Sequence, residues 1–381
     1  TLATLRFFHD APQGKDEKGV SGYKGFFYHF LDMKAGRRFA DTELSTVDTA
    51  LLLGGVLFAQ SYYDRDDPVE LDIRALSEII YRRVDWNWAQ WRAPLIAYGW
   101  YPDKGYIKLD WQGYNEAMLI YILALGSPSH PVGPEAWQAW TQTYDKTWGS
   151  FHGQTFLNFA PLFGHQYSHQ WLDFREIRDA YMKRRGIDYF ENSRRATYAQ
   201  RSYAIANPRG WKGYGENIWG LTACDGPLDV AVFRGGLPRA FRTYAPRGVG
   251  RDYTIDDGTL APSALAASLP FAPEIVVPAT EEMHRRYGAE IYGQYGFLDA
   301  FNPSFNYKAK VRHGRVVQGF GWVDTDYLGI DQGPIIAMIE NYRSDLVWRV
   351  MRSNPHIQRG LKRAGFTGGW LDALAADKGK P

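Results

Sequence analysis

The sequence predicts an all-α or mainly α protein whose long loops carry function on one face. Helix-length apolar segments recur along the 381 residues, and each is followed by a loop rich in aromatic residues and in glycine or proline. Strand signals are short and weak, and the absence of a heptad pattern excludes a coiled coil. The loops are longer than a simple bundle needs, and long loops on a rigid scaffold commonly carry function.

Apolar patterning and capping signals predict the helices of the first third. Residues 45–63 are apolar around most of the helix, which predicts a buried helix. The Asp-Asp-Pro sequence at 66–68 favours a helix over 68–83, because proline suits a first helical turn. Residues 115–125 predict a helix that stops at Gly126, a residue common just after helix ends.

The rest of the chain continues the same pattern. Further helices are predicted over 168–185, 187–206, 262–287 and 331–351. Pro270 and Pro273 should break or kink the helix over 262–287. The strand candidates are 25–31, 105–109 and 316–322.

Composition narrows the class of protein. Lys+Arg is 44 and Asp+Glu is 42, and no block of five like charges occurs, so no basic face for a nucleic acid is indicated. No apolar run approaches the roughly 18 residues of a membrane span. The single cysteine, Cys224, excludes an internal disulfide. The chain has 14 tryptophans, 25 tyrosines and 21 phenylalanines, a high aromatic content that suits either a large aromatic core or sugar binding.

Two carboxylates flank the start of the helix over 45–63. Ser45 and Asp48 fit a capping box with Asp in place of the usual Glu, which would be a structural role for Asp48. The alternative is a functional carboxylate at a helix mouth, with Glu43 just before it. The two roles are compatible, because a helix N-terminus both holds and biases a carboxylate.

A second candidate acid stands at the start of the helix over 115–125. Asn115 is a plausible N-cap and Glu116 the first helical residue, so Glu116 could simply complement the helix dipole. The preceding loop carries Trp111 and Tyr114. A carboxyl group between aromatic rings is desolvated, which raises its pKa and suits a general acid.

Other polar candidates have weaker signals. Glu216 and Trp219 lie in a glycine-rich loop that resembles a ligand-lining segment, whereas 225–227 indicates a turn. His165, His169 and Asp173 would share one face of a helix, a spacing that could hold a metal, but hydrogen bonding to a ligand or to the core is favoured over a metal. Asp331 is a natural cap before Pro334, and Glu340 has Arg343 as a possible ion-pair partner. No nucleophile elbow, P-loop or CxxC motif is present, and no cofactor is expected.

Several of these stretches together resemble the bacterial glucoamylase-like glycoside hydrolases, which include the β-1,2-glucan-degrading glycoside hydrolase family 144. The resemblance covers nearly the whole chain in the expected order. The matching stretches are 21–38 (SGYKGFFYHFLDMKAGRR), 43–55 (ELSTVDTALLLGG), 113–131, 161–182, 188–208, 213–227 (GYGENIWGLTACDGP), 295–303 (YGFLDAFNP) and 329–344 (GIDQGPIIAMIENYRS).

The resemblance implies one (α/α)6 barrel, a double ring of helices over residues 1–381, with the active site in a cleft at one end. Members of the family usually carry a further helical stretch upstream with a glycine-rich segment. This sequence has none, so we expect an additional N-terminal segment in the native protein.

The resemblance also implies a substrate and roles for residues. Similar proteins act on β-1,2-glucan or sophoro-oligosaccharides through a carboxyl general acid and a second carboxylate. By this resemblance Glu116 is the general acid, Asp48 the base or base-side residue, and Glu43 and Glu216 are reserves. The residues expected to line sugar subsites are Trp111, Tyr114, His165, Tyr167, His169, Trp219 and Asp331.

Three functions stay open on the sequence. The first is hydrolysis of β-1,2-glucan, with inversion. The second is transglycosylation of the same sugar, because similar domains occur in cyclic β-1,2-glucan synthases. The third is glucan binding without catalysis. A polymeric substrate implies a periplasmic or secreted bacterial protein. We separately expect no metal, no nucleic-acid partner and no membrane span.

Overall fold

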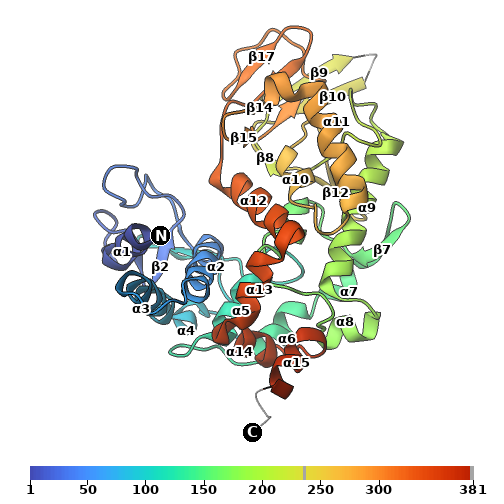
Figure 1. Ribbon diagram of the computed structural model, residues 1–381. Coiled ribbons are helices and arrows are strands. Elements are labelled where there is room, and N and C mark those ends of the chain that lie inside the picture. The colour runs from blue at the N-terminus through green and yellow to red at the C-terminus, as the bar shows by residue number, and fades with distance from the viewer. Residues whose placement is uncertain (235–236, 378–381) are drawn as a thin grey trace. The chain divides into compact units, whose positions relative to one another are not determined.

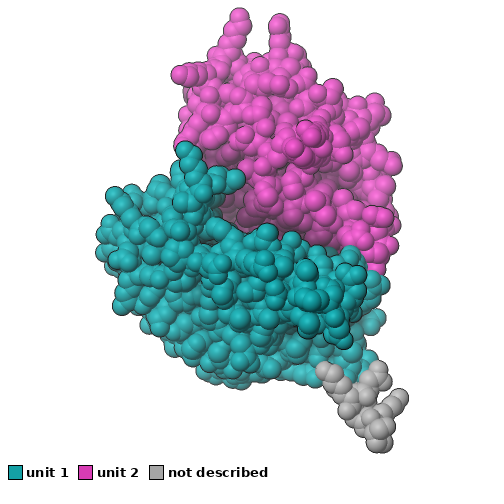
Figure 2. Space-filling model, turned by 60° about the vertical axis from the view of Figure 1, so that its left-hand side comes forward, with its two compact units in different colours: residues 1–144, 171–189, 346–381 teal, residues 145–170, 190–345 magenta. Residues whose placement is uncertain are grey.

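Helices form most of the regular structure, and the strands are short, which confirms the predicted mainly α class. The computed structural model describes residues 1–234 and 237–377 (Figure 1). The chain divides into two compact units (Figure 2). Unit 1 comprises residues 1–144, 171–189 and 346–381, and unit 2 comprises residues 145–170 and 190–345.

Unit 1 is built from three separate stretches of chain. Its helices are α1 (Leu2–Asp10), α2 (Thr46–Tyr62), α3 (Pro68–Arg82), α4 (Trp86–Ala89), α5 (Met118–Gly126), α6 (Glu135–Thr141), α8 (Ala180–Arg185), α13 (Leu346–Ser353), α14 (Pro355–Arg363) and α15 (Gly369–Asp377). Helix α14, the second-last of the chain's described helices, packs on α5 (Figure 1). A β-carbon at Gly126 or Gly360 would lie only 2.3 or 2.1 Å from a carbonyl oxygen of the facing helix, so glycine allows this close approach.

A five-stranded antiparallel sheet leads the chain into α2. Its strands pair in chain order and are β1 (Gly22–Tyr23), β2 (Phe26–Tyr28), β3 (Leu44–Ser45), β4 (Gly99–Tyr101) and β5 (Gly105–Tyr106). In the register of β3, Ser45 pairs with Phe27 on one side and with Gly99 on the other. Because α2 begins directly after Ser45, the sheet fixes where the first turn of this helix lies.

Unit 2 combines longer helices with small β-hairpins. The part of α9 (Tyr189–Ala206) from residue 190, α10 (Pro262–Ala266), α11 (Pro273–Ile291) and α12 (Gly329–Ser344) are its helices, with the 3₁₀ turn η1 (Leu162–His165). α7 (Tyr144–Thr147) begins at the last residue of the first stretch of unit 1. The strands are β6 (Trp148–Phe151), β7 (Gln154–Leu157), β8 (Ala223–Cys224), β9 (Val230–Arg234), β10 (Leu237–Phe241), β11 (Ala245–Pro246), β12 (Gly248–Gly250), β13 (Tyr253–Ile255), β14 (Tyr292–Gly293), β15 (Gly296–Phe297), β16 (Phe301–Asn302), β17 (Arg315–Val317) and β18 (Gly321–Val323).

Most predicted helices are confirmed, including the break near Pro270 and Pro273, which separates α10 from α11. The helix predicted over 331–351 is two helices, because Asp345 adopts a left-handed conformation with φ 61° between α12 and α13. The helix predicted over 168–185 is wrong for most of its length, since only Ala180–Arg185 is helical. The strand candidates 25–31 and 105–109 contain β2 and β5, whereas 316–322 spans the hairpin of β17 and β18 rather than one strand. The other hairpins of unit 2 were not predicted.

Two structural roles predicted from the sequence are confirmed. Asp67 caps α3, where its side chain accepts hydrogen bonds from the backbone of Val69 and Glu70. Glu340 pairs with Arg343 at 3.2 Å. No helix among the described residues is both long and apolar enough to span a bilayer.

Candidate active site

Three titratable side chains meet at the start of α2 in unit 1. His29 follows β2, Glu43 precedes β3, and Asp48 lies in the first turn of α2. Nδ1 of His29 lies 2.7 Å from Oε1 of Glu43, and Nε2 lies 3.5 Å from Oδ2 of Asp48. One imidazole therefore bridges two carboxylates that the sequence had placed near a helix mouth.

The charges of this group support one another. The hydrogen bond that Nδ1 of His29 donates to Glu43 is the main cause that raises the pKa of His29, and the same bond is the main cause that lowers the pKa of Glu43. All three side chains keep partial exposure, at 36% for His29, 24% for Glu43 and 27% for Asp48. A solute can therefore reach the group, which a purely structural ion pair would not require.

The predicted capping box is confirmed, with one difference. Ser45 is the N-cap of α2, and its hydroxyl accepts a hydrogen bond of 3.2 Å from the backbone N–H of Asp48. The hydroxyl of Ser45 in turn donates to Oδ2 of Asp48 at 2.5 Å, whereas the usual box has the acid accept from the N-cap backbone. Asp48 thus has its structural role and still faces His29.

Glu116 lies just outside α5 rather than within it. The prediction that Glu116 is the first helical residue is wrong by two residues, because α5 begins at Met118. The side chain of Asn115 accepts a hydrogen bond of 2.9 Å from the backbone N–H of Ala117, and this turn places Glu116 before the helix. Oε2 of Glu116 is fully buried, although the residue as a whole keeps partial exposure.

Burial changes the acidity of Glu116 in the predicted direction. Desolvation is the main cause that raises its pKa from 4.5 to about 7, and the negative charge of Asp48 adds to the effect. A carboxyl group with a pKa near 7 can hold its proton in neutral solution and release it during a reaction. Glu116 is therefore a carboxyl group that can hold a proton near neutral pH, and the charge of Asp48 in the same unit contributes to its raised pKa.

Aromatic side chains support this pair. The rings of Tyr98 and Trp111 stack with centroids 3.8 Å apart, and Nε1 of Trp111 donates to Oγ1 of Thr46 at 2.9 Å in the first turn of α2. Burial raises the pKa of Tyr98 to about 12, and the charge of Glu116 contributes. Tyr114 is buried and stacks on Tyr189. Trp111 therefore connects the loop before Glu116 to the helix that carries Asp48.

The histidines predicted from the 163–175 stretch lie in unit 2, but not on an α-helix. Residues 162–165 form the 3₁₀ turn η1, so the expected face with His165, His169 and Asp173 four residues apart does not exist. His165 and His169 are buried, and burial lowers the pKa of each to about 3. His165 lies 3.1 Å from the carbonyl oxygen of Phe159, and His169 lies 3.2 Å from Oγ of Ser193.

The other predicted residues of unit 2 differ in their surroundings. Glu216 is 69% exposed and lies 2.5 Å from Arg201, so it lacks the desolvation that distinguishes Glu116. Trp219 is 1% exposed, and Tyr167 is half-buried beside Phe163. The prediction that Asp331 is a helix cap is wrong, because α12 begins at Gly329 and Asp331, 5% exposed, lies inside its first turn. The structure thus brings Glu43, Asp48 and Glu116 together in unit 1. The four residues just described, from Glu216 to Asp331, belong to unit 2 instead.

Sequence reasoning missed two features. His29 was not singled out, although it lies in the HFLD stretch at 29–32 that carries part of the resemblance. Asp225, assigned to a turn, lies with Asp299 and Asp324 in a group of carboxylates that could hold a metal ion. No local spacing signals this second group, because Asp299 and Asp324 follow Asp225 by 74 and 99 residues in the chain.

Comparison with known proteins defines the class of this protein. The family model described as Putative glucoamylase (Glycoamylase) matches residues 108–355, and the chain belongs to this family. The matched region includes Glu116 and the carboxylates of unit 2, and it begins after Asp48.

Individual relatives extend the similarity beyond the family model. The chain is 29% identical to the exo β-1,2-glucooligosaccharide sophorohydrolase (non-reducing end) of Parabacteroides distasonis over 374 residues. That match covers 90% of this chain and 47% of the relative, so the chain spans about half of the length of this curated relative.

Solved structures align along almost the whole chain. A putative glucoamylase from Bacteroides uniformis is 32% identical, with a TM-score of 0.80, and the match covers 97% of this chain and 82% of that one. The endo-β-1,2-glucanase from Chitinophaga pinensis, solved with sophorotriose and glucose, is 28% identical, with a TM-score of 0.79 and coverage of 97% and 81%.

Proposed function

We propose that this protein is a glycoside hydrolase that cleaves β-1,2-linked glucan or sophoro-oligosaccharides, with Glu116 as general acid and Asp48 on the side of the base. The observation that carries the proposal is the raised pKa of the partly buried Glu116, to about 7, beside the charge of Asp48. The names of the Parabacteroides distasonis and Chitinophaga pinensis relatives support the linkage.

The chemistry follows from the two carboxyl groups. Glu116, protonated near neutral pH, donates its proton to the oxygen of the leaving sugar as the glycosidic bond breaks. Asp48 accepts a proton from the attacking water, and the new C–O bond forms on the opposite face of the sugar ring with inversion. His29, held by Glu43 at 2.7 Å, keeps the carboxylate of Asp48 oriented.

We extend the proposal to architecture and location. The solved relatives match about 97% of this chain, which supports one (α/α)6-barrel catalytic domain over residues 1–381. Trp111, Tyr114, His165, Tyr167, His169, Trp219 and Asp331 would serve the sugar subsites. The polymeric substrate supports a periplasmic or secreted location in a bacterium, because a long glucan does not cross a membrane unaided.

The test compares linear β-1,2-glucan with starch and laminarin. We expect sophoro-oligosaccharides from the first polymer alone, measured by chromatography, and the α-anomer as first product by proton NMR. Retained anomeric configuration with disproportionation of sophoro-oligosaccharides would instead identify a transglycosylase. Saturable binding without new reducing ends would identify a binding protein.

Replacing the acid tests its assignment. Glu116→Gln should lower kcat by about 10²-fold or more, because the amide cannot donate a proton to the leaving group, while oligosaccharide binding is kept. Glu135→Gln, an exposed acid in the first turn of α6, is the matched control and should behave as the wild type. Near-normal turnover by Glu116→Gln would exclude Glu116 as the acid.

A further inference from the structure

Three carboxylates from distant segments converge within unit 2. Asp225 follows β8, Asp299 lies between β15 and β16, and Asp324 follows β18. One carboxylate oxygen from each residue lies within 4.8 Å of an oxygen of the other two. Three acidic groups on three separate loops are thus gathered at one point of the fold.

Two of the three carboxylates are buried, and no positively charged side chain of the described residues pairs with the group. Asp299 is 1% exposed and Asp324 is 0% exposed, and Asp225 is half-buried. In the described part of the chain, no lysine or arginine forms an ion pair with any of the three. Burial of unpaired carboxylates costs several kcal/mol for each ion, so a native fold compensates such a group with a cation or with protons.

Single oxygens of this group are left without donors. Oδ1 of Asp324 accepts hydrogen bonds from the backbone of Thr325 and Asp326, at 2.6 and 3.2 Å, which fixes the orientation of the carboxylate. Oδ2 of Asp324 is fully buried and has no hydrogen-bond partner among the described residues. Oδ2 of Asp299 accepts from the backbone of Asp225 at 2.9 Å, whereas its Oδ1 is also buried and has no such donor.

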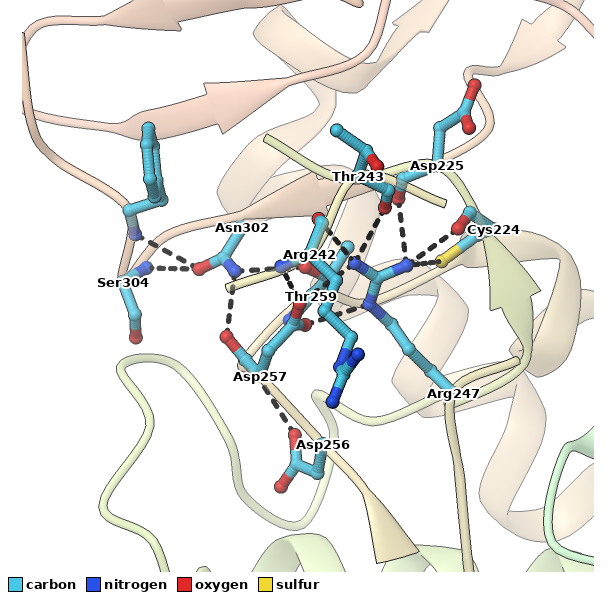
Figure 3. Close-up of polar contacts among 12 residues, drawn as sticks. Cys224, Asp225, Arg242, Thr243, Arg247, Asp256, Asp257, Thr259, Asn302 and Ser304 are labelled. Carbon is cyan, nitrogen blue, oxygen red and sulfur yellow. Dashed lines mark hydrogen bonds and ion pairs between the residues drawn. The ribbon is translucent and has the colours of Figure 1, made fainter. Parts of the chain in front are cut away.

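The backbone of the loop that carries Asp225 is held by a buried arginine, Arg247. Arg247 is 0% exposed and donates to the carbonyl oxygens of Cys224 and Asp225 at 2.6 and 3.3 Å. Its charge is matched by Asp257, which accepts two hydrogen bonds of 2.8 Å. Figure 3 shows that the side chain of Asp225 points away from this guanidinium. Arg247 therefore orders the backbone and leaves the carboxylate of Asp225 uncompensated.

We propose that Asp225, Asp299 and Asp324 bind a divalent cation with the chemistry of Ca²⁺. The ligands available are carboxylate oxygens, which hard cations of this kind prefer. Oδ2 of Asp324, which is buried and has no hydrogen-bond partner among the described residues, supplies a free acceptor. The cation ties three loops of unit 2 together. This site involves none of the carboxyl groups proposed for glycoside cleavage, so its test is independent of the proposed function.

Two neighbouring groups define the alternatives. His313 and Asp326 also lie within 4.8 Å of Asp225, on a more exposed side, and a cation held there would use a nitrogen ligand. Asp331 lies against Asp299, and burial raises the pKa of both carboxyl groups above the usual value for aspartate. Protons shared between these two acids could replace a cation.

The test measures Ca²⁺ binding by protein that has been treated with EDTA and dialysed. Calorimetry with CaCl₂ should give one site per chain, with weaker binding of MgCl₂, and saturating Ca²⁺ should raise the Tm by several degrees. No binding heat and an unchanged Tm would overturn the proposal, and stabilisation by acid alone would then identify protons as the compensating charge.

Two variants distinguish cation binding at the buried carboxylates from a purely structural role of these side chains. Asp324→Asn should weaken Ca²⁺ binding at least about tenfold, yet in EDTA its Tm should equal or exceed that of the wild type, because a buried charge is removed. A Tm below the wild type in EDTA, with Ca²⁺ binding unchanged, would overturn the proposal. Asp326→Asn is the matched control and should retain binding; loss of binding in this variant alone would place the cation at His313 instead.

Discussion

At the scale of single residues, the surroundings of Glu116 matter more than its position in the chain. Its carboxyl group would be an ordinary helix-start acid if α5 began two residues earlier. Instead a turn at Asn115 places Glu116 before the helix. There its Oε2 is buried, and the negative charge of Asp48 raises its pKa further. Desolvation and a like charge act in the same direction, and both favour the protonated acid.

The raised pKa of Glu116 predicts a pH-dependent stability. Below pH 4.5 the folded and unfolded chains both hold the proton, so Glu116 makes its full contribution to the free energy of unfolding there. As pH rises to about 7, the unfolded chain loses the proton first, and the folded chain is progressively destabilised. Glu116→Gln should therefore gain about 2–3 kcal/mol relative to the wild type between pH 4.5 and 8, with some loss to solvent screening.

Urea unfolding of both proteins at pH 4.5 and at pH 8 measures this difference. Glu135→Gln again provides the control, since this acid is exposed. A stability difference between wild type and Glu116→Gln that stays constant over this pH range would contradict the desolvated state of Glu116.

The imidazole of His29 provides a second prediction at this scale. His29→Gln should lower kcat on the order of 10- to 100-fold with a smaller change in KM, because Asp48 loses the group that orients it. His9→Gln is a matched control: His9 lies 2.7 Å from Asp10 and is also 36% exposed, but belongs to α1. Equal effects of the two variants would show that His29 has no special role.

At the scale of elements, α2 carries both a catalytic candidate and a tightly packed face. The helix is apolar nearly all round, and Leu53, Gly54 and Leu57 are buried. A β-carbon at Gly54 would lie 2.6 Å from Nε1 of Trp171, whereas one at Gly55 would only touch the far edge of that ring at 3.7 Å. Of these two adjacent glycines, only Gly54 lies where packing leaves no room for a β-carbon.

This contrast predicts opposite effects of one substitution. Gly54→Ala should destabilise the protein by about 1–3 kcal/mol, because the indole of Trp171 must move in a packed core. Gly55→Ala should stabilise it by up to about 1 kcal/mol through helix propensity. Thermal and urea unfolding of both variants test the pair, and a stabilising Gly54→Ala would show that Trp171 yields freely.

At the scale of the whole molecule, segments far apart in sequence are joined by buried polar contacts. In unit 2, Arg247 links the end of β8 to Asp257, and Asn302 donates to the carbonyl oxygen of Asp257 at 3.0 Å (Figure 3). In unit 1, Asn354 donates to the backbone of Leu57 in α2 at 3.3 Å. Such contacts fix loops that have little regular structure of their own.

The buried ion pair predicts an asymmetric response to substitution. Arg247→Met should cost about 3–5 kcal/mol, because Asp257, 2% exposed, keeps a buried charge without its partner. The double variant Arg247→Met with Asp257→Leu should recover part of this loss. Arg285→Met, which removes a surface pair with Glu282, should cost less than about 1 kcal/mol. Urea unfolding measures all three, and equal costs for Arg247→Met and Arg285→Met would refute the argument.

Local rules explain which parts of the fold could be predicted. The cap at Asp67, the break at Pro270 and Pro273, and the capping box at Ser45 depend on neighbours within four residues, and all three are confirmed. The stretch 168–179 misled the same reasoning, because its apolar spacing suits a helix while the chain forms turns there. The start of α5 moved because the Asn115 side chain competes with the helix for backbone donors.

By itself, the sequence determined the mainly α class, the starts of α2 and α3, the family, and the acids Glu116 and Asp48 as candidates. These features rest on local chemistry and on motifs in order. Only the tertiary structure decided which acid is desolvated, that His29 bridges Glu43 and Asp48, and that Asp225, Asp299 and Asp324 meet. Burial and charge proximity are properties of contacts between distant segments, and no spacing along a single sequence contains them.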